Sequence, residues 1–361
     1  MHYLPTRIIY GDKAVSQGSQ YLKSLGKKAL FVTGKSSALA SGVQDDIISV
    51  LKQLQIEWVL FNRVQENPDL QTVMAGANVF TENGCDFLIG IGGGSPIDAA
   101  KAIALTAANH LDLDSIYNTA LFKQTYPVVA VPTTAGTGTE ATQYSVLTDA
   151  AAQKKAGFGH DLAYPVLALI DPKYTLTLSK KVTLNTGIDA LSHLLEGIYS
   201  NKRMPLLYPL IYKGVSLIFK NLPKVLHNPS DLAARDALMR ASLYGGITIS
   251  HTSTTLQHSI GYPLTSVYNV PHGLANGIVM KAMLDLYYPY VSAELDDLFA
   301  YLSISRQDFY AWLDVFQMAA GVKISQDFIE AKIPEVLASR NMANNPFAVT
   351  AEDIRKIYLT L

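Results

Sequence analysis

The pattern of the chain changes once, near Asp171-Pro172, and this change constrains the fold more than any other feature of the sequence. Before this point, short apolar runs typical of strands alternate with stretches of helical period. After it, the strand signal stops and only stretches of helical period follow. Alternating strands and helices are typical of a mostly parallel sheet covered by helices. We therefore expect a dinucleotide-binding α/β domain at residues 1–178 and an all-helical metal-binding and substrate domain at residues 179–361.

The expected elements can be given as sequence runs. The predicted strands are KKALFVTG, EWVLFNRV, CDFLIGIGGG, YPVVAVPTT and PVLALIDP, and the predicted helices between them are QDDIISVLKQLQ, DLQTVMAGANVFTENG and SPIDAAKAIALTAAN. The second half predicts helices at VTLNTGIDALSHLLEGIYS, PLIYKGVSLIFKNLPKVL, DLAARDALMRASLYGGITIS and residues 273–286. RNMANNPF is expected to be a polar loop that only connects two helices. Sheets of this kind place their binding loops at the carboxyl ends of the strands.

The length and charge of the chain limit the number of domains and the kinds of molecule that it can bind. A chain of 361 residues fits about two domains. The formal net charge is -1 and the Lys and Arg residues are dispersed, so we expect a small-molecule substrate and no nucleic-acid or membrane partner. Charged residues make up 16% of the chain, against roughly 25% in average globular proteins. This low share predicts a large buried fraction and a homo-oligomer, with a dimer as the first expectation.

The single cysteine, Cys85, excludes an internal disulfide and fits a reducing compartment. The start of the chain, MHYLPTRIIYGDKAV, lacks a basic region followed by an apolar one, and no apolar run approaches the ~20 residues of a membrane span. We therefore expect a soluble, cytoplasmic protein.

A run of glycines stands between the third predicted strand and its helix, at Gly92-Gly93-Gly94-Ser95, with Asp98 just beyond. Glycines let the backbone approach a pyrophosphate, and the N–H groups and positive end of the following helix stabilise its charge. The run differs from the usual G-x-G-x-x-G, and a tight strand-to-helix turn would also use glycines. Its position directly after a strand favours a phosphate-binding loop.

A second polar loop, PTTAGTGTE, follows the fourth predicted strand and contains Thr133, Thr134 and Thr137. Hydroxyl groups at the carboxyl end of a strand can bond ribose, phosphate or a nicotinamide amide, although a plain Thr-rich turn would have the same composition. Two such loops at one edge of a sheet favour a dinucleotide over a mononucleotide.

A third loop, with Gly34, Lys35 and Ser36, follows the first predicted strand. It is not a P-loop, because that motif needs a glycine where Ala29 stands. In dinucleotide folds an acidic residue in this region bonds the adenosine ribose and repels a 2'-phosphate, whereas Gly with Lys and Ser can accept that phosphate. The sequence therefore favours NADP(H) over NAD(H).

Four residues of the second half are candidate metal ligands. Asp189 and His193 stand four apart in a predicted helix, so both side chains leave one face. His258 lies near the end of a second predicted helical stretch, and His272 begins a third. Any one of these residues alone is an ordinary polar residue of a helix. Together, three imidazoles and a carboxylate suit iron(II) or zinc with room for a substrate oxygen.

The motifs GGGSPIDAAK, PTTAGTGTE, IDALSHLLEG, LQHSIGYPL and PHGLANGI resemble those of the iron-containing (group III) alcohol dehydrogenase family, in the family's order along nearly the whole chain. The resemblance implies NAD(P)-dependent oxidation of alcohols or reduction of aldehydes and ketones at a metal in the cleft. It places the metal ligands and the glycine and threonine loops on the residues named above, with no catalytic residue beyond the metal ligands. It also implies cofactor contacts at Lys155 and Leu176, for which a turn and plain packing are the alternatives.

One position departs from several family members. Tyr262 stands where they carry a further histidine, four residues after the third ligand, so a histidine proton relay is not expected there. A glycerol dehydrogenase-like polyol oxidoreductase is the nearest alternative function. A dehydroquinate synthase-like lyase is disfavoured, because the surroundings of the ligands are nearly free of the Lys and Arg that a phosphorylated substrate needs. A metal-dependent hydrolase would need a carboxylate base, for which Glu196 is the candidate.

Overall fold

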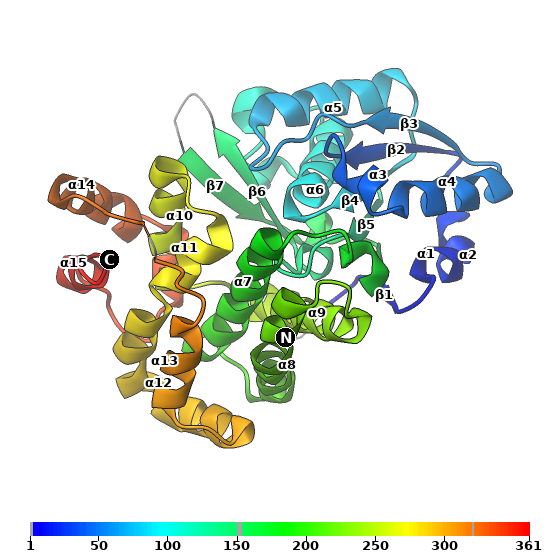
Figure 1. The fold of residues 1–361 in the computed structure, drawn as a ribbon. Helices are drawn as coiled ribbons and strands as arrows, with labels where there is room; N and C mark the ends of the chain where they lie inside the picture. The colour runs from blue at the N-terminus through cyan, green and yellow to red at the C-terminus, as the bar shows by residue number, and fades with distance from the viewer. Residues whose placement is uncertain (1–2, 150–153, 320) are drawn as a thin grey trace.

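A computed structural model describes residues 3–149, 154–319 and 321–361 of the chain. Its centre is a six-stranded, wholly parallel sheet with the strand order β1-β8-β5-β4-β2-β3 (Figure 1). The strands are β1 (Arg7–Tyr10), β2 (Lys28–Thr33), β3 (Glu57–Phe61), β4 (Phe87–Gly92), β5 (Val128–Pro132) and β8 (Leu167–Ile170). The predicted parallel sheet is confirmed, and all five predicted runs form strands in it.

Alternate side chains of the strands point into two cores. Leu30 and Val32 of β2 pack with the helices α5 (Leu70–Glu82) and α6 (Gly94–Asn109), whereas Ala29 and Phe31 pack with α4 (Val43–Leu54) on the other face. A sheet covered on both faces needs continuous apolar strands, which is why these runs could be read from the sequence. Short helices α1 (Ala14–Gln17), α2 (Ser19–Leu22) and α3 (Ser37–Ala40) complete the α4 side.

Three strands were not predicted. The edge strand β1 has only four residues, with Arg7 among them. The other two, β6 (Tyr144–Asp149) and β7 (Lys154–Gly159), form a separate antiparallel pair that packs on α6. The turn that was the alternative to a cofactor contact at Lys155 is excluded, because the backbone there pairs with Thr148 of β6. The sequence of β7 contains two lysines and two glycines, which is not typical of a strand. Pairing with β6 therefore determines the extended conformation of β7.

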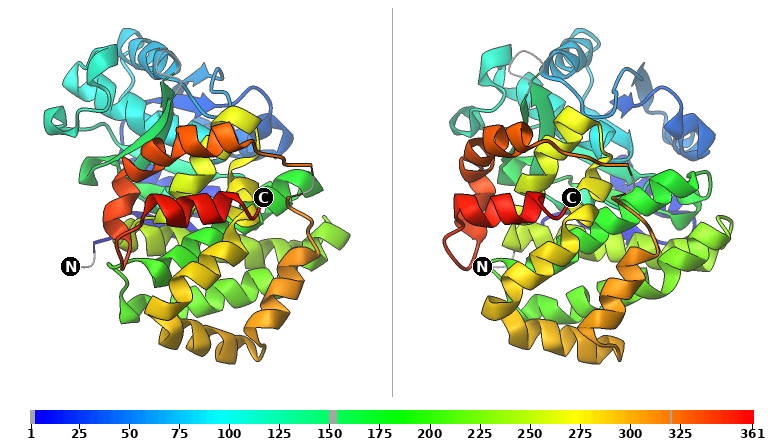
Figure 2. Two further views of the ribbon diagram at one scale, coloured as in Figure 1. Left: turned by 90° about the vertical axis from the view of Figure 1, so that its left-hand side faces the viewer. Right: turned by 60° about the vertical axis from the view of Figure 1, so that its left-hand side comes forward.

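From residue 180 onward the described chain is helical. The elements are α7 (Lys180–Tyr199), α8 (Tyr208–His227), α9 (Leu232–Thr252), α10 (Leu256–Tyr268), α11 (His272–Ile278), α12 (Met280–Leu302), α13 (Arg306–Asp314), α14 (Gln326–Leu337) and α15 (Ala351–Tyr358). Helix α7 is fully buried over 187–199 and contacts α8, α9, α11 and α12. It therefore lies at the centre of the helical half (Figure 2).

Three predictions within the helical half were wrong in detail. The run 273–286 is not one helix, because Val279 separates α11 from α12. His258 lies in the first turn of α10 and not near the C-terminal end of a helix. RNMANNPF does more than connect helices, since Asn345 is buried and its Oδ1 accepts a hydrogen bond of 3.2 Å from the Leu256 backbone N–H.

The two halves meet at the threonine loop. Gly138 has a left-handed φ of +58°, and a Cβ built on it would lie 2.5 Å from Cα of Gly246 in α9. Only a residue without a side chain allows this approach of loop to helix. A second contact joins β1 to the same helix, where the Tyr10 hydroxyl donates to Oδ1 of Asp236 over 2.7 Å. The loop at the end of β5 is thereby held against the helical half.

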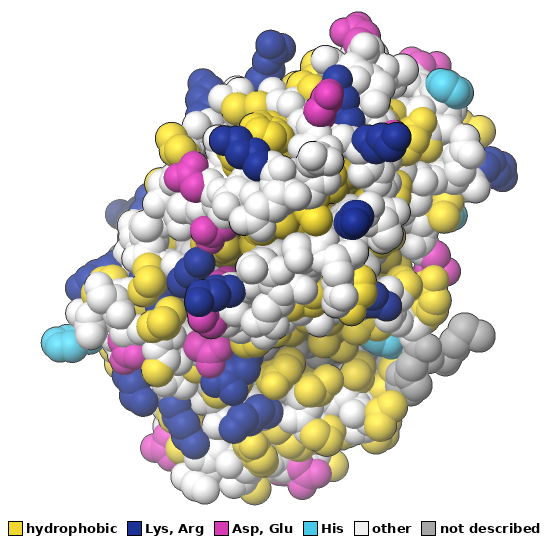
Figure 3. Space-filling view, turned by 90° about the vertical axis from the view of Figure 1, so that its right-hand side faces the viewer, with side chains coloured by type: hydrophobic (Ala, Val, Ile, Leu, Met, Phe, Trp, Pro, Cys, Tyr) yellow, Lys and Arg dark blue, Asp and Glu magenta, His cyan; other side chains and the backbone are white. Residues whose placement is uncertain are grey.

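The surface agrees with the charge composition. On the face in Figure 3, Lys and Arg side chains are interspersed with Asp and Glu and form no stripe of one sign. Within the described residues, no helix has the length and apolar character that crossing a membrane requires.

Candidate active site

Helix α7 places the first two candidate ligands side by side. Asp189 and His193 are 4% and 5% exposed, and the Asp189 carboxylate reaches Nε2 of His193 at 4.0 Å. Ser179 caps the helix start by accepting a hydrogen bond from the Val182 N–H over 3.2 Å. Burial lowers the pKa of His193, which keeps its imidazole neutral and able to offer a lone pair.

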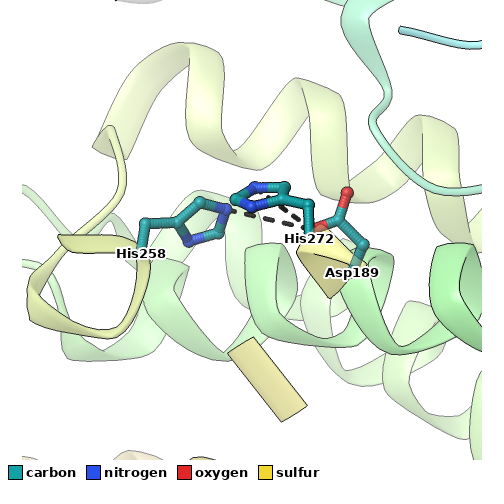
Figure 4. Close-up of side chains that lie close together, drawn as sticks. All are labelled: Asp189, His258 and His272. Carbon is teal, nitrogen blue, oxygen red and sulfur yellow. Dashed lines mark ion pairs between the residues drawn. The ribbon is translucent and has the colours of Figure 1, made fainter. Parts of the chain in front are cut away.

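The other two candidates reach the same carboxylate from separate helices. Nε2 of His258 in α10 lies 4.0 Å from Oδ1 of Asp189, and Nε2 of His272 at the start of α11 lies 3.8 Å from it (Figure 4). Ligand atoms of these three residues all lie within 4.8 Å of one another. His193 adjoins this group, since its ring stacks on His258 with centroids 5.0 Å apart. Packing therefore brings all four predicted residues together.

The spacing of these atoms fits a shared divalent cation. Distances of 3.8 to 4.0 Å are too long for hydrogen bonds between the imidazoles and Asp189. Two atoms that each lie about 2.1 Å from one ion can be separated by at most about 4.2 Å. Three imidazoles with one carboxylate are the donor set of iron(II) or zinc. The residues present therefore fit the metal that the sequence predicts.

Two further side chains border the candidate ligands. Nδ2 of the buried Asn276 lies 3.3 Å from Oδ1 of Asp189 and 3.2 Å from Nε2 of His258. Asn276 was not predicted from the sequence, although it follows His272 by four residues and so shares its helix face. The ring of Tyr262 stacks on His272 with centroids 5.4 Å apart, and burial raises the pKa of its phenol. Tyr262 therefore stays a neutral hydroxyl beside the site.

The glycine loop lies at the carboxyl edge of the sheet, as predicted. Gly92 ends β4 with φ +145°, and helix α6 starts at Gly94 with no side chain capping its first N–H groups. A sixteen-residue helix with free N–H groups at its start is suited to an anion. Ser95 accepts a hydrogen bond from the Asn67 N–H over 3.2 Å.

The threonine loop packs against the glycine loop. The Thr133 N–H donates to the Gly92 carbonyl over 2.8 Å, which joins the ends of β5 and β4. Cβ atoms built on Gly93 and Gly94 would lie 3.2 Å from Oγ1 of Thr134 and 2.8 Å from Cγ2 of Thr137. The two loops thus form one continuous surface at the edge of the sheet.

Asp98 faces the protein interior next to these loops. Its carboxylate accepts hydrogen bonds from the Thr139 hydroxyl over 2.5 Å and from the Val146 N–H over 3.0 Å. The fully buried Lys101, one turn further along α6, donates to the carbonyls of Thr139 and Tyr144 over 2.7 and 2.8 Å. These contacts tie the threonine loop to α6, so Asp98 and Lys101 position that loop. The sequence indicates this only through their spacing in GGGSPIDAAK, which places both residues on one face of the helix.

Glu140, at the end of the same loop, gives the protein a pH dependence. It is 1% exposed, and burial raises its pKa to about 7 although the nearby Lys101 opposes the shift. Between pH 4.5 and about 7, Glu140 keeps its proton in the folded protein but loses it in the unfolded chain. The contribution of Glu140 to the free energy of unfolding therefore falls as pH rises through this range.

We predict that Glu140→Gln removes this pH dependence. The free energy of unfolding should exceed that of the wild type by up to roughly 3 kcal/mol above pH 7 and differ little below about pH 5. Urea unfolding at the two pH values measures the difference, with Glu82→Gln on the exposed surface of α5 as the control. An equal effect of Glu140→Gln at both pH values would contradict the prediction.

The remaining predicted cofactor residues lie at or near the sheet edge. Gly34, Lys35 and Ser36 follow β2, which is the neighbour of β4 in the sheet. The side chains of Lys35 and Ser36 are exposed. Leu176 is 36% exposed just after η5 (Pro172–Thr175), which follows β8. The side chain of Lys155 lies outside the described part of the chain. Cofactor contacts at these residues stay predictions.

A parallel sheet with a glycine loop at its carboxyl edge, together with a buried carboxylate and imidazoles on helices, is the arrangement that the sequence predicts for a metal-dependent dehydrogenase. Residues 5–172 match the family model for iron-containing alcohol dehydrogenase, and residues 183–361 match the model for the C-terminal part of that family. The chain belongs to the iron-containing alcohol dehydrogenase family. The predicted resemblance is thereby confirmed.

Individual relatives agree with this assignment. The chain is 33% identical to the NAD-dependent methanol dehydrogenase of Bacillus methanolicus over 77% of its own length and 73% of the relative's. It is 32% identical to the NADPH-dependent butanol dehydrogenase of Clostridium saccharobutylicum over 80% and 72%. The crystal structure of an iron-containing alcohol dehydrogenase from Thermotoga maritima has a TM-score of 0.94 at 35% identity, with 100% of this chain and 98% of that chain covered. The family's activity is NAD(P)-dependent alcohol dehydrogenation.

Proposed function

We propose that this chain transfers hydride between NADP(H) and a small alcohol or aldehyde at a divalent metal, iron(II) by family membership. Asp189, His193, His258 and His272 would hold the metal. The observation that carries the proposal is the single carboxylate oxygen of Asp189, which three imidazole nitrogens approach to 3.8–4.0 Å from three helices. When bound, the metal would act as a Lewis acid toward the substrate oxygen, and the nicotinamide would carry the hydride.

The residues of the chain have separate tasks in this proposal. The Asp189 carboxylate would offset part of the charge of the cation, and the imidazoles of His193 and His258 are buried, whereas the His272 side chain is 23% exposed. The start of α6 and the hydroxyls of Thr134 and Thr137 would hold the dinucleotide, with the pyrophosphate at the free N–H groups of the helix. Tyr262 would form a wall of the substrate pocket next to His272. The two halves would thus orient cofactor and substrate relative to each other.

The preference for NADP(H) rests on the loop after β2. Lys35 and Ser36 are exposed next to the glycine loop, and no acidic residue stands at 34–36 to repel a 2'-phosphate. The two relatives above do not decide the question, because the methanol dehydrogenase is NAD-dependent and the butanol dehydrogenase is NADPH-dependent. Reduction of an aldehyde is the proposed direction with NADPH.

A coupled assay tests the function. Purified protein should oxidise NADPH in the presence of short aldehydes more efficiently than NADH, and a strong chelator should abolish turnover while dinucleotide binding, followed by fluorescence titration, stays largely intact. Adding iron(II) without air should restore the rate. Full activity of a metal-free preparation would contradict the proposal. Higher kcat/KM for glycerol and related polyols than for simple alcohols would favour the polyol oxidoreductase instead.

A further inference from the structure

Glu196 is the third ionisable residue on the buried face of α7. It follows Asp189 by seven residues and His193 by three, so all three side chains lie along one face of the helix. Its side chain is completely buried, at 0% exposure. A carboxylate in such a position needs donors for both oxygens, because a buried charge without partners is strongly unfavourable.

The donors come from the start of α10. Oε1 of Glu196 accepts hydrogen bonds from the backbone N–H of Thr255 over 2.6 Å and from its hydroxyl over 2.8 Å, and the His258 N–H lies 3.4 Å away. Thr255 is the N-cap residue of α10, and its own side chain does not cap the helix. Glu196 therefore supplies the cap from another helix, where the positive end of α10 stabilises its charge.

The second oxygen contacts the His258 ring. Oε2 of Glu196 is hydrogen-bonded to Nδ1 of His258. The opposite nitrogen, Nε2, lies 3.2 Å from the amide Nδ2 of Asn276, which is a donor, and 4.0 Å from Oδ1 of Asp189. A proton on Nδ1 and a lone pair on Nε2 satisfy both sides of the ring. The ring is thereby oriented with its lone pair toward the candidate metal ligands.

We propose that Glu196 is a positioning residue that fixes the tautomer and direction of His258 for metal binding. A carboxylate on the far nitrogen of a ligand imidazole orients the ring and makes it a stronger ligand. The inference rests on the proposed metal site. It also excludes Glu196 as the general base of a hydrolase, because both of its oxygens are engaged by α10 and neither faces a substrate.

Metal affinity of Glu196→Gln tests the inference. The variant keeps the shape, but its amide group can accept at only one end, so either Thr255 or the His258 ring loses its acceptor. Competition for Zn²⁺ with a chromogenic chelator should show affinity reduced roughly 10- to 100-fold, and the visible absorption of the Co²⁺-loaded protein should change. Glu196→Asp withdraws the carboxylate from the His258 ring and should also lower the affinity for Zn²⁺. This second variant tests the inference if Glu196→Gln does not fold.

Tyr287→Phe is the matched control. It removes a hydroxyl that donates to Oδ1 of Asn345 and lies 3.4 Å from the Leu256 N–H, so it loosens the same helix start without touching His258. Its metal affinity and Co²⁺ spectrum should equal those of the wild type. Wild-type affinity in both Glu196 variants would overturn the inference, as would an equal loss in Tyr287→Phe. A wild-type protein that binds no Zn²⁺ or Co²⁺ would instead overturn the proposed metal site, and this inference with it.

Discussion

Asp189→Asn should fold normally, take up little metal and turn over on the order of 1,000-fold more slowly than the wild type. The amide keeps the shape of the side chain but removes the one negative charge that the three imidazoles surround. Lewis-acid stabilisation of several kcal/mol, at about 1.4 kcal/mol per tenfold in rate, corresponds to this loss. Elemental analysis and kcat/KM measure the two effects on one preparation.

The control for this variant is Asp285→Asn, an exposed carboxylate on α12 in the same half of the protein. It should keep the metal content and rate of the wild type. Because the dinucleotide edge lies in the other half, Asp189→Asn should also retain the wild-type affinity for NADPH. Normal metal content in Asp189→Asn would show that the ligands have been misassigned.

Gly94→Val should give the reciprocal result, with the metal retained and dinucleotide binding weakened roughly 10- to 100-fold. A Cβ on Gly94 would lie 2.8 Å from Cγ2 of Thr137, so the branched side chain forces the glycine and threonine loops apart. Overpacking of this kind costs about 1–3 kcal/mol, and about 1.4 kcal/mol is tenfold in affinity. Fluorescence titration with NADPH measures the loss.

Asn78→Val is the matched control for Gly94→Val. It places the same branched side chain on the exposed surface of the neighbouring helix α5, away from both loops. The dinucleotide affinity of this control should equal that of the wild type. Wild-type NADPH affinity in Gly94→Val would show that the cofactor does not use the glycine loop. Loss of metal in the same variant would show that the two halves do not bind their ligands independently.

The parallel sheet was predictable because burial on both faces makes each strand a continuous apolar run. Where this condition fails, the prediction fails too. β1 lies at the edge of the sheet and is fixed by pairing with β8, about 160 residues further along the chain. β7 carries lysines and glycines and is fixed by pairing with the preceding strand, β6. His258 was predicted near the end of a helical stretch, and not in the first turn of α10, for a related reason. Ser253 has a left-handed φ of +57°, and Glu196 caps the helix from fifty-nine residues away, which no local pattern reveals.

The candidate site, like the fold, could be predicted from the sequence only in part. The pairing of Asp189 with His193 follows from helical spacing alone, because residues four apart share a face. Bringing His258 and His272 to the same point requires the packing of α11 on α7 and of α10 on α11. Helical spacing does not determine this packing, and the family resemblance supplied it. Asn276 entered only with the structure, and Glu196, which the sequence offered only as the base of a hydrolase, received its positioning role there. The importance of both residues lies in which atoms they contact.

The close approach of Gly138 to Gly246 has a consequence for anyone who tries to change the cofactor preference of this enzyme. The segment with the candidate cofactor threonines rests on α9 without intervening side chains, so a fraction of an ångström of movement in that helix passes directly into the segment. Redesign of the nucleotide edge therefore cannot be confined to residues that touch the nucleotide. Positions on α9 belong to the same design problem, although they lie more than a hundred residues further along the chain.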